Sequence, residues 1–98
     1  MLEEIAWLEE GERMTYFVFK ANGSQYSLSS EKPLTLEQMM KLVGGWIEFV
    51  CGPTEETTLC VNEEGLLKKL PKNKEFPGLV GDVVMGRLDE GKFVGVLR

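Results

Sequence analysis

Few side chains in this 98-residue sequence are suited to catalysis, and histidine is absent. Cys51 and Cys60 are the two cysteines, and without a third soft ligand they cannot complete a zinc site. We interpret them as small apolar residues buried in strands, with a cross-strand disulfide as the alternative. Nucleophilic catalysis usually needs a histidine base. The sequence therefore predicts a protein that is not an enzyme, with no catalytic residue, metal or cofactor.

Paired acidic residues could in principle hold a metal ion. Glu55–Glu56 and Asp89–Glu90 are such pairs, and metal-dependent nucleases use clustered acids of this kind. Both pairs fall in predicted turns, where acidic residues are ordinary. We therefore expect no metal site at either pair.

A basic segment lies between residues 68 and 74, within a chain whose formal net charge is −5. We interpret it as a solvated loop, with an anion-binding edge for a nucleotide, a phosphate or an acidic partner as the alternative. The negative net charge argues against nonspecific nucleic-acid binding, which relies on Lys and Arg. The residues that would bind the anion are Lys68, Lys69, Lys72 and Lys74.

The elements that must position these residues begin with a hairpin. Asn22–Gly23 separates two alternating segments, and this dipeptide is typical of a two-residue type I′ turn. That turn predicts that Phe19 faces Tyr26 and that Phe17 faces Leu28, with all four side chains on one face of the hairpin.

A helix is predicted after the hairpin. Thr35 and Gln38 form a capping box, Leu34 can pack onto Met39, and Gly44 is expected to end the helix in a left-handed conformation. Its apolar stripe contains Leu36, Met39, Met40 and Val43.

Several antiparallel strands should follow the helix. They are predicted at 46–51, 57–61 and 66–70, then around 83–85 and at 92–97, with Gly86 and Gly95 marking bulges or close packing. Trp46 is expected in the core. The order predicts an α+β fold, a roll or a β-grasp-like arrangement, in which one helix covers a mixed or antiparallel sheet.

The length predicts one domain over residues 1–98, with residues 1–13 as an acidic appendage that is either a short helix or extended. No apolar run reaches the length of a membrane span and the first residues do not resemble a secretory signal, so we expect a cytoplasmic protein. Trp7 and Leu8 in the appendage, and Phe76 in a loop, are the candidate interaction residues.

Four short motifs occur in order along the chain: Leu-Val-Gly-Gly-Trp-Ile-Glu at 42–48, Asn-Glu-Glu-Gly at 62–65, Leu-Pro-Lys-Asn at 70–73 and Gly-Asp-Val-Val at 81–84. In this order they resemble a family of small domains of unknown function found in phages and mobile elements. The resemblance covers about half the chain and implies a single-helix domain with no assigned chemistry.

These observations favour a small protein-interaction module from a phage, plasmid or other mobile element. Small β-rich domains often associate through a strand at the edge of a sheet, so we expect a homo-oligomer or a protein partner. A small anionic-ligand or nucleotide-binding domain that uses the lysines of residues 68–74 is the alternative.

Overall fold

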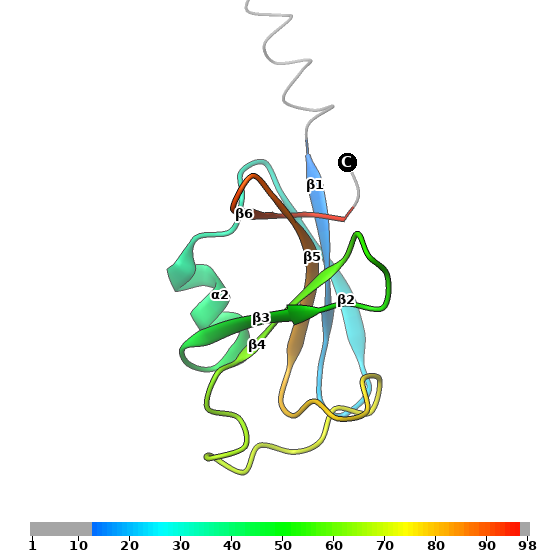
Figure 1. Ribbon diagram of the computed structural model, residues 1–98, viewed down its shortest axis with the longest axis vertical. Helices are drawn as coiled ribbons and strands as arrows, with labels where there is room; N and C mark the ends of the chain where they lie inside the picture. Colours follow the sequence, from blue (N-terminus) through cyan, green and yellow to red (C-terminus); the bar gives the residue numbers. More distant parts are fainter. Residues whose placement is uncertain (1–12, 97–98) are drawn as a thin grey trace, which may run out of the picture.

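A computed structural model describes residues 13–96 as one antiparallel sheet and one helix, which confirms the predicted α+β class (Figure 1). The sheet has the strand order β2-β1-β5-β4-β3, and β6 pairs with β5 outside that path. The elements are β1 (Met14–Phe19), β2 (Gln25–Ser30), α2 (Leu36–Val43), β3 (Ile47–Cys51), β4 (Thr58–Asn62), β5 (Val83–Asp89) and β6 (Lys92–Val94).

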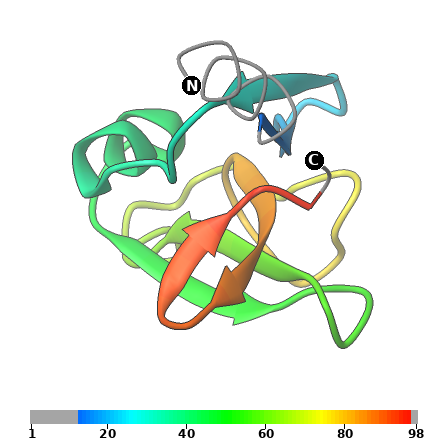
Figure 2. The ribbon, with the colours of Figure 1, turned by 90° about the horizontal axis from the view of Figure 1, so that it is seen from above.

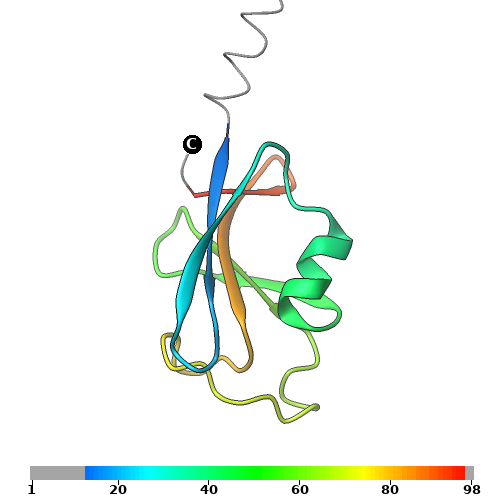
Figure 3. The same cartoon turned by 180° about the vertical axis from the view of Figure 1, so that it is seen from behind.

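The two faces of the sheet are covered differently. Helix α2 packs on one face, where Tyr16, Cys60 and Val84 are completely buried. The long connection between β4 and β5 covers part of the other face, where Leu59 and Val83 are buried and Phe76 and Leu79 pack against them. Seen from behind, this connection also runs below the β1–β2 turn (Figure 3).

The β1–β2 hairpin forms as predicted, but its register is shifted by one residue. Tyr16 faces Leu28 and Val18 faces Tyr26, so Phe17 and Phe19 lie on the opposite face from these two β2 residues. The loop contains three residues, because the N–H of Lys20 donates to the carbonyl oxygen of Ser24 (2.8 Å) and the N–H of Gly23 donates to that of Lys20 (3.0 Å). The positive φ of Gly23 (101°) fits the bulged three-residue loop, which competes with the type I′ turn for the same Asn-Gly pair.

Helix α2 begins and ends where the local signals predict. The Thr35 hydroxyl accepts the N–H of Gln38 (3.1 Å), and the Gln38 side chain accepts the N–H of Thr35 (2.9 Å), which completes the capping box. Gly44 closes the helix with a φ of 85°. Only part of the predicted stripe is buried, since Met39 and Val43 face the core while Leu36 is exposed.

The strands after the helix follow the prediction with two exceptions: β6 ends at Val94 although its strand was predicted over 92–97, and one predicted strand does not form. Residues 66–70, predicted as a strand, belong to a hydrogen-bonded turn that begins directly after β4. β5 and β6 form the predicted C-terminal hairpin, which lies in front of β3 and β4 when the molecule is seen from above (Figure 2). A Cβ on Gly86 would lie 2.5 Å from the carbonyl oxygen of Val94, and one on Gly95 would lie 2.6 Å from the nitrogen of Thr15, so both glycines mark close packing.

Candidate protein-interaction surface

Strand β3 forms one edge of the sheet. About half of its backbone N–H and C=O groups point away from β4, toward a side where no strand of the described residues lies. The N–H of Gly52 donates to the carbonyl oxygen of Thr57 (3.0 Å), and the N–H of Glu63 donates to that of Trp46 (2.8 Å). Even-numbered residues therefore bond to β4, while odd-numbered ones turn their N–H and C=O groups outward. No other strand within residues 13–96 pairs with this edge. The outward β3 residues are Ile47, Phe49 and Cys51.

Strand β2 forms the opposite edge and provides a matched comparison. The hydrogen bond from Lys20 to Ser24 shows that even-numbered residues of β2 bond to β1, so its odd-numbered residues turn outward. All of their side chains are polar and exposed. The outward β2 residues are Gln25, Ser27 and Ser29.

Apolar side chains gather along the β3 edge. Phe49 is 38% exposed and packs on Phe93, with ring centroids 5.1 Å apart. Trp46, just before β3, is 56% exposed, and Leu88 at the end of β5 is 48% exposed. The prediction that Trp46 is a core residue is therefore wrong, because β3 lies at the edge and no strand covers its beginning. We define the β3 edge surface as the exposed residues Phe49, Trp46 and Leu88 together with three further β3 residues, so that it contains Trp46, Ile47, Phe49, Val50, Cys51 and Leu88.

Grooves lie on both sides of this edge. On the side of α2, a groove of about 510 Å³ is lined by Phe49, Cys51 and Leu88 with residues of the β3–β4 turn. On the other side, a groove of about 400 Å³ is lined by Val50 and by two leucines of the turn after β4, Leu66 and Leu67. These leucines are 80% and 83% exposed, so apolar surface continues beyond the strand.

The beginning of β3 is held in place by a buried asparagine. The side-chain NH₂ of Asn62 donates to the carbonyl oxygen of Val43 at the end of α2 (3.1 Å), and its oxygen accepts the N–H of Glu64 (2.8 Å). A Cβ on Gly45 would lie only 3.0 Å from the nitrogen of the Asn62 side chain. Asn62 and the Gly44–Gly45 turn therefore fix where the edge strand leaves the helix.

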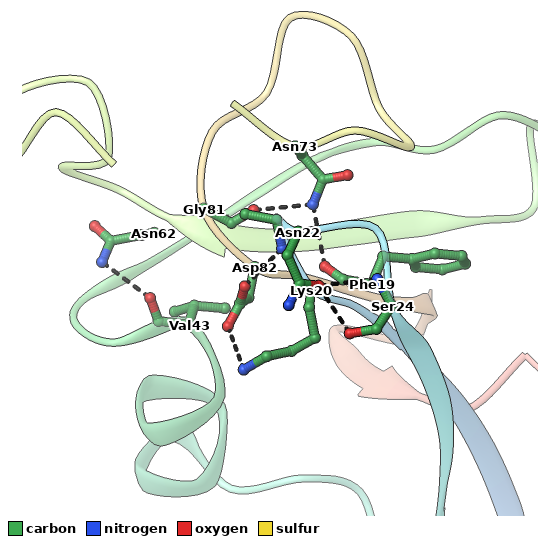
Figure 4. A network of polar contacts seen from close by, with 10 residues as sticks. Phe19, Lys20, Asn22, Ser24, Val43, Asn62, Asn73, Gly81 and Asp82 are labelled. Atoms are coloured by element: carbon green, nitrogen blue, oxygen red, sulfur yellow. Dashed lines mark hydrogen bonds and ion pairs between the residues drawn. The ribbon is translucent and has the colours of Figure 1, made fainter. Parts of the chain in front are cut away.

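A second buried asparagine fixes the long connection to the β1–β2 hairpin (Figure 4). The side-chain NH₂ of Asn73 donates to the carbonyl oxygens of Phe19 (3.1 Å) and Gly81 (2.9 Å). Its oxygen accepts the N–H groups of Glu75 (2.9 Å) and Phe76 (3.1 Å). All four hydrogen-bonding positions of this amide are used, so Asn73 has a structural role.

Asp82 joins the same hairpin to the start of β5. Its carboxylate accepts the N–H of Ala21 (2.9 Å) and the ammonium group of Lys20 (2.8 Å). The hydrogen bond to Asp82 raises the pKa of Lys20 above its ordinary value of 10.5. Asn62, Asn73 and Asp82 each belong to one of the sequence motifs noted above, and in each case the side chain connects elements of the fold.

The four lysines predicted as an anion site are all exposed and lie against different elements. Lys68 pairs with Glu64 at 3.4 Å, and its Nζ lies 3.1 Å from the position of a Cβ on Gly45. The side chain of Lys74 covers Gly23 of the β1–β2 loop. Lys69 has a positive φ of 56°, and Lys72 forms an isolated bridge with Val80.

The two cysteines are separate thiols in the structure and do not lie directly opposite each other on β3 and β4. Cys60 faces Phe49 and is completely buried, whereas Cys51 faces Thr58 and is exposed. Burial raises the pKa of the Cys60 thiol to about 12. The interpretation as buried apolar residues therefore holds for Cys60 and is wrong for Cys51.

The other candidate interaction residues divide into two groups. Phe76 is half-buried and meets the ring of Phe19 edge-on, with centroids 4.9 Å apart, so it closes the core on the face away from α2. Trp7 and Leu8 lie outside the described residues.

Two further features concern metals and membranes. Within residues 13–96, no three Cys, Asp or Glu side chains gather closely enough to hold a metal ion. The helix that the structure describes is too short and too polar to cross a membrane.

Residues 14–98 match the model of a family described as "Domain of unknown function (DUF3846)". The chain belongs to this family. The match is wider than the four motifs and includes the β1–β2 hairpin, while residues 1–13 precede it. No curated protein and no solved structure matches the chain.

The β3 edge surface was not predicted from the sequence as a site. Trp46 and Phe49 looked like ordinary strand residues, because exposure at an edge depends on which strands become neighbours. One local signal was present: 46–51 has neither Lys nor Pro, the residues that commonly protect an exposed edge.

Proposed function

We propose that this DUF3846 domain is a non-enzymatic protein-interaction module that binds through the β3 edge surface. The observation that carries the proposal is the coincidence, on β3, of outward backbone groups with apolar outward side chains. An added strand can bond to such an edge through its main chain and gain specificity from pockets beside it, and grooves of suitable size lie on both sides. We also propose that the protein acts in the cytoplasm. The motif resemblance supports the further proposal that it comes from a phage, plasmid or other mobile element.

The buried polar side chains support a binding role over a catalytic one. Asn62 and Asn73 are the two buried polar residues of the described chain, and both are bonded to backbone groups. Every buried side-chain nitrogen or oxygen within residues 13–96 has a hydrogen-bond partner. An unpaired buried polar group is one sign of a site that awaits a substrate, and the described residues contain none.

An anionic-ligand site receives less support than the edge surface. Lys68 already pairs with Glu64, and Lys68 and Lys74 lie against different turns. Exposed lysines without a buried polar partner hold an anion only weakly.

The proposal can be tested by recovering the full chain gently from its host and measuring the mass of its complexes by native mass spectrometry. Three forms are compared: the natural sequence, Phe49→Lys on β3 and Ser27→Lys on β2. A lysine at position 49 places a charge in the centre of the surface, whereas position 27 is the matched outward position of the other edge.

We expect the natural chain and Ser27→Lys to be recovered in the same complex and Phe49→Lys to be recovered alone. Circular dichroism of the purified variants controls for folding. The proposal is contradicted if the natural chain has no protein partner, or if Phe49→Lys folds and keeps the complex.

A further inference from the structure

The outward β3 residues allow this strand to pair with a copy of itself. In an antiparallel pair, residues exchange hydrogen bonds when the N–H and C=O groups of both point across the gap, so here odd-numbered residues must face odd-numbered ones. A two-fold axis at Phe49 meets this condition, because Phe49 then faces Phe49 of the second copy and Ile47 faces Cys51. Both copies use all their outward residues, which gives about six backbone hydrogen bonds.

Side chains at the even-numbered positions fit the same axis. Glu48 faces Val50 of the second copy, so the single charge of the strand does not meet its own equivalent. Trp46, which is 56% exposed in the single chain, faces Gly52 of the second copy, where Thr57 of that copy fills the position of the missing side chain. An axis at Glu48 would instead place two carboxylates opposite each other and pair Cys51 with Gly45, which lies outside β3.

Charges at the two ends of β3 are also complementary under this axis. The ammonium group of Lys68 lies beside Gly45, at the beginning of the strand. The turn after the strand carries Glu55 and Glu56, both exposed. Because the axis places Gly45 opposite Pro53 of the second copy, it brings each Lys68 to the end of the interface that holds the acidic turn of the other chain.

We propose that the partner of the β3 edge surface is a second copy of this chain, paired β3 to β3 in antiparallel orientation about Phe49. This inference rests on the proposed function and names the partner of that surface. It joins two sheets into one continuous sheet, with α2 of each copy on the same face, since a two-fold axis perpendicular to the sheet preserves the faces.

Disulfide trapping tests this register. Two full-length variants are prepared in a Cys51→Ser background, one with Glu48→Cys and the other with Val50→Cys. Positions 48 and 50 form a pair with Cα atoms about 4.5 Å apart across the proposed interface, close enough for a disulfide. Two copies of the same position are offset by two residues, roughly 7 Å along the strand, and cannot be bridged without backbone movement.

After mild oxidation of the mixed variants we expect a disulfide-linked dimer on a non-reducing gel, at least about tenfold more than in either variant alone. The proposal is overturned if the mixture gives no more dimer than the separate variants, or if Glu48→Cys alone crosslinks equally well, which would indicate another register. If the mixture does not crosslink while Phe49→Lys still loses its complex in the host, a different protein binds the edge: the proposed function then stands and the assignment of a second copy fails.

Discussion

The two edges of this sheet have the same backbone geometry and opposite side-chain chemistry. The outward β2 residues are all polar, and Ser29 among them accepts a hydrogen bond from Arg13 (3.1 Å), which also lies 3.6 Å from Glu31. The outward β3 residues are apolar, and β3 carries one charge, that of Glu48, on its inward set. Polar and charged groups commonly protect an edge from further pairing. The comparison indicates that β2 is a protected edge and β3 an edge that accepts a strand.

The anchors of the two edges differ as well. Asn62 connects β4 to the end of α2 beside β3 by neutral, buried hydrogen bonds. The hairpin that carries β2 is held by the buried amide of Asn73 and also by the ion pair of Lys20 with Asp82, in which the lysine side chain is 43% exposed. The anchor of β3 is therefore neutral and independent of pH in the ordinary range, whereas part of the hairpin anchor depends on charge.

Asn62→Ala should give the largest effect on stability. It leaves the carbonyl oxygen of Val43 and the N–H of Glu64 without their partner, and we expect a loss of about 2–3 kcal/mol in the free energy of unfolding. The matched change at the other edge, Ser29→Ala, removes only an exposed contact with Arg13 and should cost less than about 0.5 kcal/mol. Urea denaturation measures both. Equal losses would show that the two edges are supported alike.

Chemical modification of Cys51 should have the next largest effect. At neutral pH, iodoacetate should modify one thiol per folded chain, because Cys60 is buried and its pKa is raised to about 12, whereas Cys51 is exposed. The carboxymethyl group then adds a negative charge to an outward β3 position and should weaken self-association about tenfold or more, as measured by sedimentation.

The control for this modification is Ser27→Cys in a Cys51→Ser background, where the same group is added to an outward β2 position. Its self-association should match that of the unmodified control. Weakening at both edges, or modification of two thiols in the folded chain, would contradict the account.

Asp82→Asn should give the smallest effect, and that effect should depend on pH. The side-chain oxygen can still accept the N–H of Ala21, so the change removes the negative charge and the second oxygen, which accepts from the ammonium group of Lys20. Since the pKa of Lys20 is raised in the folded chain above 10.5, the stabilisation is present below pH 10.5 and is lost as the pH rises through the folded pKa. We expect a difference of less than about 1 kcal/mol in the free energy of unfolding between the two proteins at pH 7, and this difference should shrink as the pH rises above the ordinary lysine pKa of 10.5. A difference that is constant with pH would contradict this assignment.

Local signals in the sequence were enough to predict the helix and the existence of both hairpins. The capping box of Thr35 and Gln38 and the left-handed Gly44 act within a few residues, so α2 begins and ends as predicted. The Asn22–Gly23 turn is equally local, but it suits both a two-residue and a three-residue loop. Because the loop has three residues, Phe17 and Phe19 lie on the face opposite Tyr26 and Leu28 and not on the same face as predicted.

Features that depend on distant residues could not be predicted in this way. Trp46 is exposed because β3 became the edge strand, and that order is set by the pairing of β4 with β5 far along the chain. One hydrogen bond of the Asn73 side chain goes to the carbonyl oxygen of Phe19, which lies 54 residues away in sequence. The candidate surface is thus a product of topology more than of any motif.

Amide hydrogen exchange of the purified chain, measured residue by residue at low and high protein concentration, tests the central claim most directly. The account predicts that the amides of the outward β3 residues exchange more slowly as the concentration rises, because a second copy bonds to them, while those of the outward β2 residues do not change. Slower exchange on β2, or no change on β3 at any concentration where the protein self-associates, would contradict it.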